Sequence, residues 1–158
     1  MTYRMTAKIL AALIAITGLS GCSREITSSD SLIYITFDRS HGSLWGNQFY
    51  IALAETEIVE TWFFQQGEME QTEVSHSPLS AEEWEEVEQA VLSLVPSLKE
   101  KKEKKGIFQK MDGTEERTLT LTWETEHGEK TVIYDFPNTD KAIALEEYLE
   151  ALAQKTQS

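Results

Sequence analysis

The feature that most constrains the fold is the alternation of apolar and threonine side chains between Arg117 and Glu124. Successive side chains of a β-strand point to opposite faces, so this pattern predicts a strand with one buried and one solvent-facing side. The apolar positions are Leu119, Leu121 and Trp123, and threonine occupies each position between them. We therefore expect a sheet that is covered on one face only.

Other segments have strand character and are separated by short turns. Residues 54–57, Asp112-Gly113 and His127-Gly128 are short enough to join hairpins, which predicts antiparallel pairing. Three or four strands are expected before the first helix, at residues 32–38, 49–53 and 59–63, with a weak edge strand at 69–75 as the fourth. Three more are expected after it, at residues 107–111, 117–124 and 130–136. The segment of residues 99–105, with five lysines and two glutamates, is expected to be a charged connector.

The third of these strands has two competing alternations. In one, Val59, Thr61 and Phe63 face inward; in the other, the inner face holds Ile58, Glu60, Trp62 and Phe64. The pattern alone leaves open whether Trp62 is buried or exposed.

Two helices are predicted from apolar residues at helical spacing. Ser80 and Glu83 form an S-x-x-E capping box at the start of the first helix, and Pro96 should end that helix near Leu94. The second helix should begin near Asp140. The predicted fold class is α+β, an antiparallel sheet of about six strands with two amphipathic helices packed on one face. The apolar stripes are Trp84, Val87, Val91, Leu94 and Leu98 in the first helix, and Leu145, Tyr148, Leu149 and Leu152 in the second.

The amino-terminal segment has the layout of an export signal. Arg4 and Lys8 supply positive charge, and an eleven-residue stretch over residues 9–19 is apolar except for Thr17. A membrane-spanning helix needs about 20 apolar residues, so a stretch of this length is typical of a cleavable signal peptide.

The apolar stretch ends in Leu19, Ser20, Gly21 and Cys22. These residues resemble the lipobox of bacterial lipoprotein precursors, which is an aliphatic residue, a small residue, Gly or Ala, and then Cys. The resemblance implies that signal peptidase II cuts before Cys22, that the Cys22 thiol carries diacylglycerol, and that the new amino group is often acylated as well. The implied location is the extracytoplasmic face of the cell membrane, or the outer membrane in a bacterium with two membranes. The alternative is an ordinary thiol in a leader of another kind.

On this interpretation residues 1–21 are the signal peptide, residues 22–31 a lipidated, serine-rich tether, and residues 32–158 one domain. The mature chain has 12 basic and 27 acidic residues, a net charge of −15. Such a chain is repelled by nucleic acid, which we exclude as a partner. Apart from the acyl chains, no cofactor is expected. No metal is expected either, because His41, His76 and His127 lack the spacing of metal ligands.

Candidate recognition groups gather in the loop that follows the first strand. Arg39, His41 and Trp45 combine charge, hydrogen bonding and an aromatic ring, so we regard them as candidate ligand-binding residues for a peptide or glycan. The acidic face of the first helix, with Glu82, Glu83, Glu85 and Glu86, is an alternative docking surface for a cationic partner.

The same loop allows a catalytic alternative. Asp38, His41 and either Ser40 or Ser43 contain an orienting acid, a base and a nucleophile. However, no G-x-S-x-G nucleophile elbow is present. We predict a lipid-anchored envelope protein whose domain is a non-catalytic binding or structural module. The alternatives are a small envelope hydrolase that uses the loop from Asp38 to His41, and an accessory subunit of a membrane complex.

Overall fold

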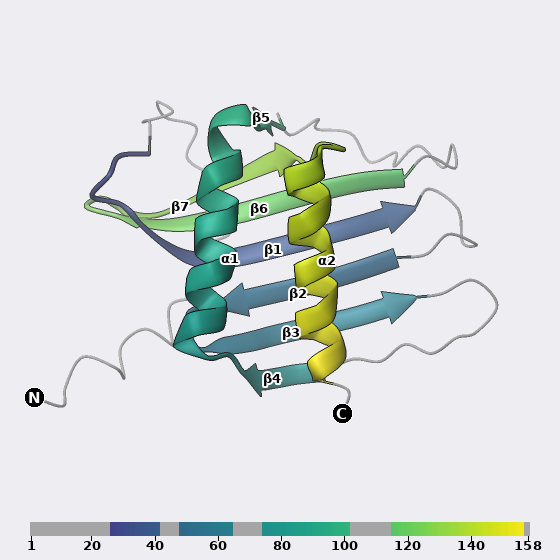
Figure 1. Ribbon diagram of the computed structural model, residues 1–158. Coiled ribbons are helices and arrows are strands. Elements are labelled where there is room, and N and C mark those ends of the chain that lie inside the picture. The colour runs from purple at the N-terminus through teal and green to yellow at the C-terminus, as the bar shows by residue number, and fades with distance from the viewer. Residues whose placement is uncertain (1–25, 42–47, 65–73, 102–114, 157–158) are drawn as a thin grey trace, which may run out of the picture.

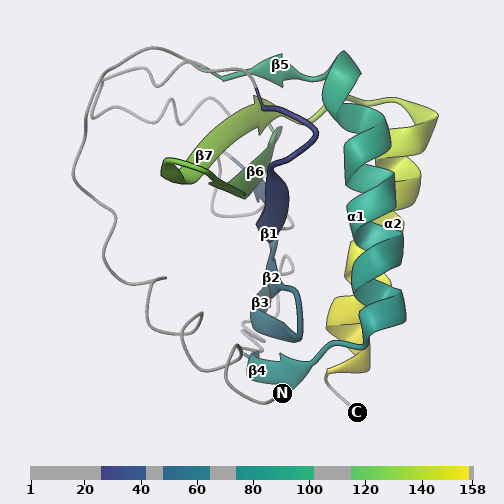
Figure 2. The ribbon, with the colours of Figure 1, turned by 90° about the vertical axis from the view of Figure 1, so that its left-hand side faces the viewer.

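The computed structural model describes residues 26–41, 48–64, 74–101 and 115–156. Within them lies a seven-stranded antiparallel sheet with two helices on one face, as Figures 1 and 2 show. The predicted α+β class is confirmed, with seven strands in place of about six. The elements are β1 (Ser31–His41), β2 (Gln48–Ala54), β3 (Glu57–Phe64), β4 (Val74–Pro78), α1 (Ala81–Leu94), β5 (Lys99–Glu100), β6 (Glu115–Thr125), β7 (Gly128–Asp135) and α2 (Asp140–Lys155).

The sheet has the strand order β4-β3-β2-β1-β6-β7-β5, with β1 at its centre. On one side β1 pairs with β2, and on the other with β6, a strand about 80 residues later in the chain. Phe37, for example, lies opposite Ile51 of β2 and Leu119 of β6. Both halves of the chain therefore meet along one central strand.

The face under the helices is the hydrophobic core, and it follows the predicted alternation. Leu119, Leu121 and Trp123 are all buried, as expected. Phe37 is fully buried, with its ring centroid 4.9 Å from that of Phe136 in an edge-to-face contact. Burying an aromatic side chain of this kind is among the larger contributions to folding.

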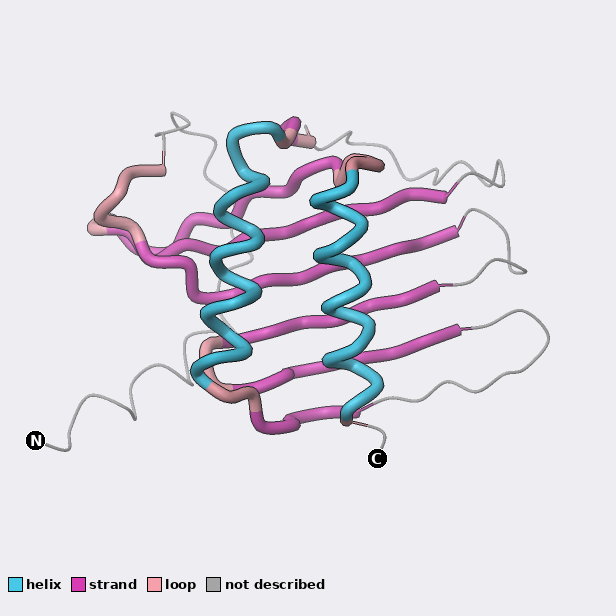
Figure 3. Tube along the Cα trace, in the orientation of Figure 1, coloured by secondary structure: helices cyan, strands magenta, loops and turns pink. Residues whose placement is uncertain are grey.

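The two helices lie side by side across the strands and run in opposite directions (Figure 3). The capping box of α1 is present, because the Ser80 hydroxyl accepts from the Glu83 amide and the Glu83 carboxylate accepts from the Ser80 amide. α1 ends at Leu94 and continues into a short 3₁₀ turn, Val95–Ser97, which contains Pro96. The Tyr148 hydroxyl of α2 donates to Glu86 of α1 over 2.5 Å, and Lys155 donates to Glu83.

A β-bulge resolves the two alternations in the third strand. Ala52 pairs with Glu60, whereas the next residue, Leu53, pairs with Ile58, so β3 has one extra residue between these pairs. As a result, Ile58 and Thr61 are both buried although they are three residues apart. Trp62 is half-buried. It follows Thr61 in the strand and so faces away from the helices.

Some sequence expectations differ from the structure or lie outside the described residues. The edge strand expected at residues 69–75 is observed as β4 at Val74–Pro78. The start of the expected connector is instead the short strand β5, whose two residues pair with Asp135 and Tyr134 of β7. The expected strand at 107–111, the lipobox residues Leu19 to Cys22 and residues 22–25 of the tether lie outside the described residues. The rest of the tether is described, and its Ile26 packs against the core. Of the helices that are described, neither is long and apolar enough to cross a membrane.

Candidate functional site

Arg39, the first candidate ligand-binding residue, is part of an ion-pair cluster between β1 and α2. Its guanidinium donates to the carboxylates of Glu146 at 2.5 Å and Glu150 at 2.6 Å, and lies 5.8 Å from the centre of the Phe49 ring. Burial would lower the pKa of Arg39, but the hydrogen bonds to the two glutamates outweigh it and raise the pKa above its usual value. Arg39 is thus committed to contacts within the protein.

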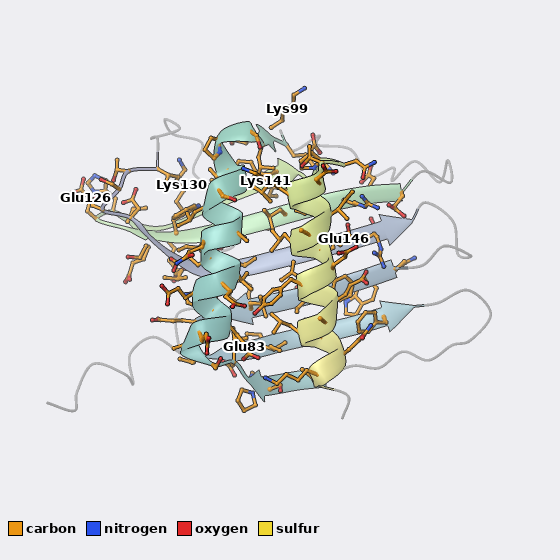
Figure 4. All side chains as sticks on the ribbon, in the orientation of Figure 1. Glu83, Lys99, Glu126, Lys130, Lys141 and Glu146 are labelled. Atoms are coloured by element: carbon orange, nitrogen blue, oxygen red, sulfur yellow. The ribbon has the colours of Figure 1, made fainter. Side chains whose placement is uncertain are left out.

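The Arg39 cluster borders an open hollow of about 260 Å³ at the ends of β1 and β6. Glu146, labelled on α2 in Figure 4, is only 5% exposed there. Its second carboxylate oxygen lies 3.5 Å from Nε of Arg117, which also pairs with Glu115 at 2.8 Å. Because these charges are mutually paired, the cluster is explained as a contact that holds α2 against the sheet. The other residues lining the hollow are Asn138, Ile143 and Glu147.

The remaining candidate residues of the loop are only partly placed. His41 is the last residue of β1, where its backbone pairs with Glu115 of β6. The side chain of His41, and all of Ser43 and Trp45, lie outside the described residues. The structure therefore brings Arg39 and His41 to one end of β1 and does not place Trp45.

The catalytic alternative needs the Asp38 carboxylate beside the His41 ring. Only Asp38 is described with its side chain, so the alternative stays a prediction. Asp38 is half-buried on the face away from the helices. Burial raises the pKa of its carboxyl group, an effect opposed by Lys101 and reinforced by Glu116. Its buried Oδ1 has no hydrogen-bond partner among the residues described.

A different group of side chains gathers on the face of the sheet that the helices leave uncovered. We call Tyr34, Tyr50 and Trp62, from β1, β2 and β3, the aromatic patch. Tyr50 lies directly opposite Trp62, and their rings are stacked, with centroids 5.6 Å apart and planes 11° apart. All three residues are half-buried.

The aromatic patch lies in a negative electrostatic environment. Burial raises the pKa of Tyr34, and the nearby carboxylates of Glu60 and Glu57 raise it further. The pKa of Tyr50 is raised to about 12, mainly by burial and then by the charges of Tyr34, Glu60 and Asp38. A hydrogen bond with Thr36 lowers this pKa, but by less than burial raises it. The register agrees with these influences, because Asp38 lies opposite Tyr50 and Glu60 lies two residues before Trp62 in β3.

Hydroxyl groups continue the uncovered face from β1 toward β7. Thr36 of β1 pairs with Thr120 of β6, and the hydroxyls of Thr122 and Thr131 are 3.0 Å apart across β6 and β7. This face thus offers aromatic rings at one side and hydrogen-bonding groups at the other. Such a surface can bind a ligand by stacking and by hydrogen bonds.

Sequence reasoning did not identify the aromatic patch as a site, although a signal was present. Tyr50 stands between Phe49 and Ile51, so strand alternation puts it on the side opposite two core residues. A large aromatic residue at a position expected to be polar is such a signal. For Trp62 the same signal was hidden by the bulge.

The chain matches no protein-family model, no curated protein and no solved structure. Within the described residues, no three or more His, Cys, Asp or Glu side chains form a group that could hold a metal ion.

Proposed function

We propose that this protein is a lipid-anchored lipoprotein of the bacterial cell envelope whose domain is a non-catalytic binding module. The binding surface in this proposal is the uncovered face of the sheet, centred on the aromatic patch. The stacked pair of Tyr50 and Trp62 is the observation that supports it most. Two large aromatic side chains are kept partly exposed on a sheet whose other face already supplies a complete core.

The anchor in the proposal is diacylglycerol on Cys22, with residues 1–21 removed. Each buried CH₂ of an acyl chain contributes about 0.8 kcal/mol, so two or three chains hold a protein to a bilayer durably. β1 begins at Ser31, nine residues after Cys22. A fully extended chain spans at most about 3.6 Å per residue, so the tether keeps the domain within roughly 30 Å of the membrane.

The anchor is tested by metabolic labelling of cells with a fatty-acid analogue, followed by mass spectrometry of the purified protein. We expect the wild type to be labelled and to lack residues 1–21. The variant Cys22→Ser should be unlabelled, and the neighbouring variant Ser23→Ala should behave like the wild type. An unlabelled wild-type protein that retains residues 1–21 would refute the anchor.

The binding module is tested with the full-length protein in non-ionic detergent and a panel of peptides and envelope glycans. We expect at least one ligand whose binding is lost in Trp62→Ala and kept in Leu92→Ala, because Leu92 is an exposed apolar residue of α1 on the helical side. The proposal fails if no member of the panel binds, or if the two variants bind equally. Turnover of an ester or peptide substrate, or labelling by a serine-directed probe, would contradict the non-catalytic part.

A further inference from the structure

We infer that the aromatic patch, together with Glu60 and Asp38, binds a cationic group: the lysine or arginine side chains of a basic peptide segment. This inference rests on the proposed function, because it names the partner of the same uncovered face. The observation that supports it is the combination of aromatic rings and carboxylates on neighbouring strands.

The first step concerns the aromatic rings. A lysine or arginine side chain within about 6 Å of a ring is attracted by the negative face of the π system, most strongly by tryptophan. Trp62 and Tyr50 present nearly parallel rings, and Tyr34 adds a third on β1. A cation over Trp62 would therefore also pack its apolar stem against aromatic surface.

The second step concerns the carboxylates. Glu60 is in the same strand as Trp62, two residues earlier, and so on the same face. No lysine or arginine of the described chain forms an ion pair with Glu60. Asp38 lies opposite Tyr50 in the register of β1 and β2 and so on the same face. Among the described residues, Glu60 therefore places a carboxylate without an ion-pair partner beside the aromatic rings.

The third step excludes other chemistries. Lys101, the lysine that influences Asp38, lies toward the β5 edge and pairs with Glu116 at 3.4 Å. An anionic partner would be repelled by a mature chain with 12 basic and 27 acidic residues. A neutral glycan could stack on the rings but would leave the carboxylate charge uncompensated. A basic segment uses both features.

The test is calorimetric titration of a heptalysine peptide into the mature full-length protein in non-ionic detergent. The variants are Trp62→Leu, which removes the π face and keeps apolar bulk, and Glu60→Gln, which removes charge and keeps shape. The control is Glu85→Gln, an exposed glutamate of α1 with the same loss of charge. Chitooligosaccharide is the neutral comparison ligand, and far-UV circular dichroism confirms that each variant is folded.

We expect heptalysine to bind, with affinity weakened at least about threefold by Trp62→Leu and about two- to fivefold by Glu60→Gln, and unchanged by Glu85→Gln. Equal weakening by Glu60→Gln and Glu85→Gln, with no effect of Trp62→Leu, would show general charge attraction and overturn the inference. Binding of chitooligosaccharide but not heptalysine would also overturn it, while leaving the binding module intact. If Trp62→Leu does not fold, the comparison of heptalysine affinity between Glu60→Gln and Glu85→Gln decides alone, and equal affinities overturn the inference. Binding of neither ligand overturns the inference, and the proposed function is then judged by its own panel.

Discussion

The two faces of the sheet are made by the same strands and carry opposite chemistry. Phe37 is fully buried beneath the helices, whereas its neighbour Asp38 is half-buried on the uncovered face. The covered face is a continuous apolar core, and the uncovered face carries tyrosine, tryptophan, threonine and carboxylate side chains. The difference teaches that the apolar core lies on one face, which is why we propose recognition for the residues of the other.

The largest contrast should appear when one residue is truncated on each face. Phe37→Ala removes a ring that packs against Phe49 and Phe136, and should lower the free energy of unfolding by about 3–5 kcal/mol. Thr120→Ala, on the uncovered face of β6, should cost about 1 kcal/mol or less. Urea denaturation of the two variants measures both values. Similar costs would break the distinction between a structural face and a recognition face.

The Arg39 cluster should show the next largest effect, because it joins the covered face to α2. Arg39→Met keeps the apolar stem but leaves the buried Glu146 without its shortest ion pair, which should cost about 2–3 kcal/mol. The control Lys141→Met changes an exposed cation of α2 and should stay within about 0.5 kcal/mol. Urea denaturation is again the measurement. An Arg39→Met protein as stable as the wild type would show that Arg39 is available for a ligand after all.

The capping box of α1 should contribute less to the stability of the protein. Ser80→Ala removes the hydroxyl that accepts from the Glu83 amide, so the free energy of unfolding should fall by about 1 kcal/mol. Ser93→Ala, an exposed position in the last turn of α1, provides the matched control. Thermal unfolding should rank the two variants in this order, and the reverse order would contradict the role of the cap.

The smallest effect on stability should come from the ionisation of Tyr50, on the uncovered face. Because the pKa of Tyr50 is raised from 10.0 to about 12, the folded protein holds this proton more tightly than the unfolded chain does. The associated stability is complete below about pH 10 and is lost as the pH rises toward about 12. Ultraviolet titration of tyrosinate should show one fewer late-ionising tyrosine in Tyr50→Phe. An unchanged late phase would mean that Tyr50 is more exposed than the structure shows.

Local patterns were enough to predict the fold class and both helices. The alternation of Leu119, Leu121 and Trp123 and the capping box at Ser80 each depend on neighbours within a few residues. Strand order does not, because a period-two pattern states which side of a strand is buried but not which strand lies beside it. The pairing of β1 with β6 therefore had to come from the structure.

Local patterns also could not predict which residues meet at the candidate site. Arg39 was chosen for its chemistry, but its partners Glu146 and Glu150 lie more than 100 residues away and meet it only in three dimensions. The stacking of Tyr50 on Trp62 depends on the register of β2 and β3 and on the bulge at Val59. Inserting one residue reverses the face of every later side chain in a strand, so a sequence pattern could not place Trp62.

The claim that the uncovered face binds a basic segment is most directly tested by two-dimensional ¹⁵N–¹H spectra of the full-length protein in detergent, recorded during titration with heptalysine. We expect the indole resonance of Trp62 and the amides of Tyr34 and Tyr50 to shift together, while the indoles of the buried Trp84 and Trp123 stay in place. Shifts confined to the acidic face of α1, at Glu82 and Glu85, with Trp62 unmoved, would contradict the account.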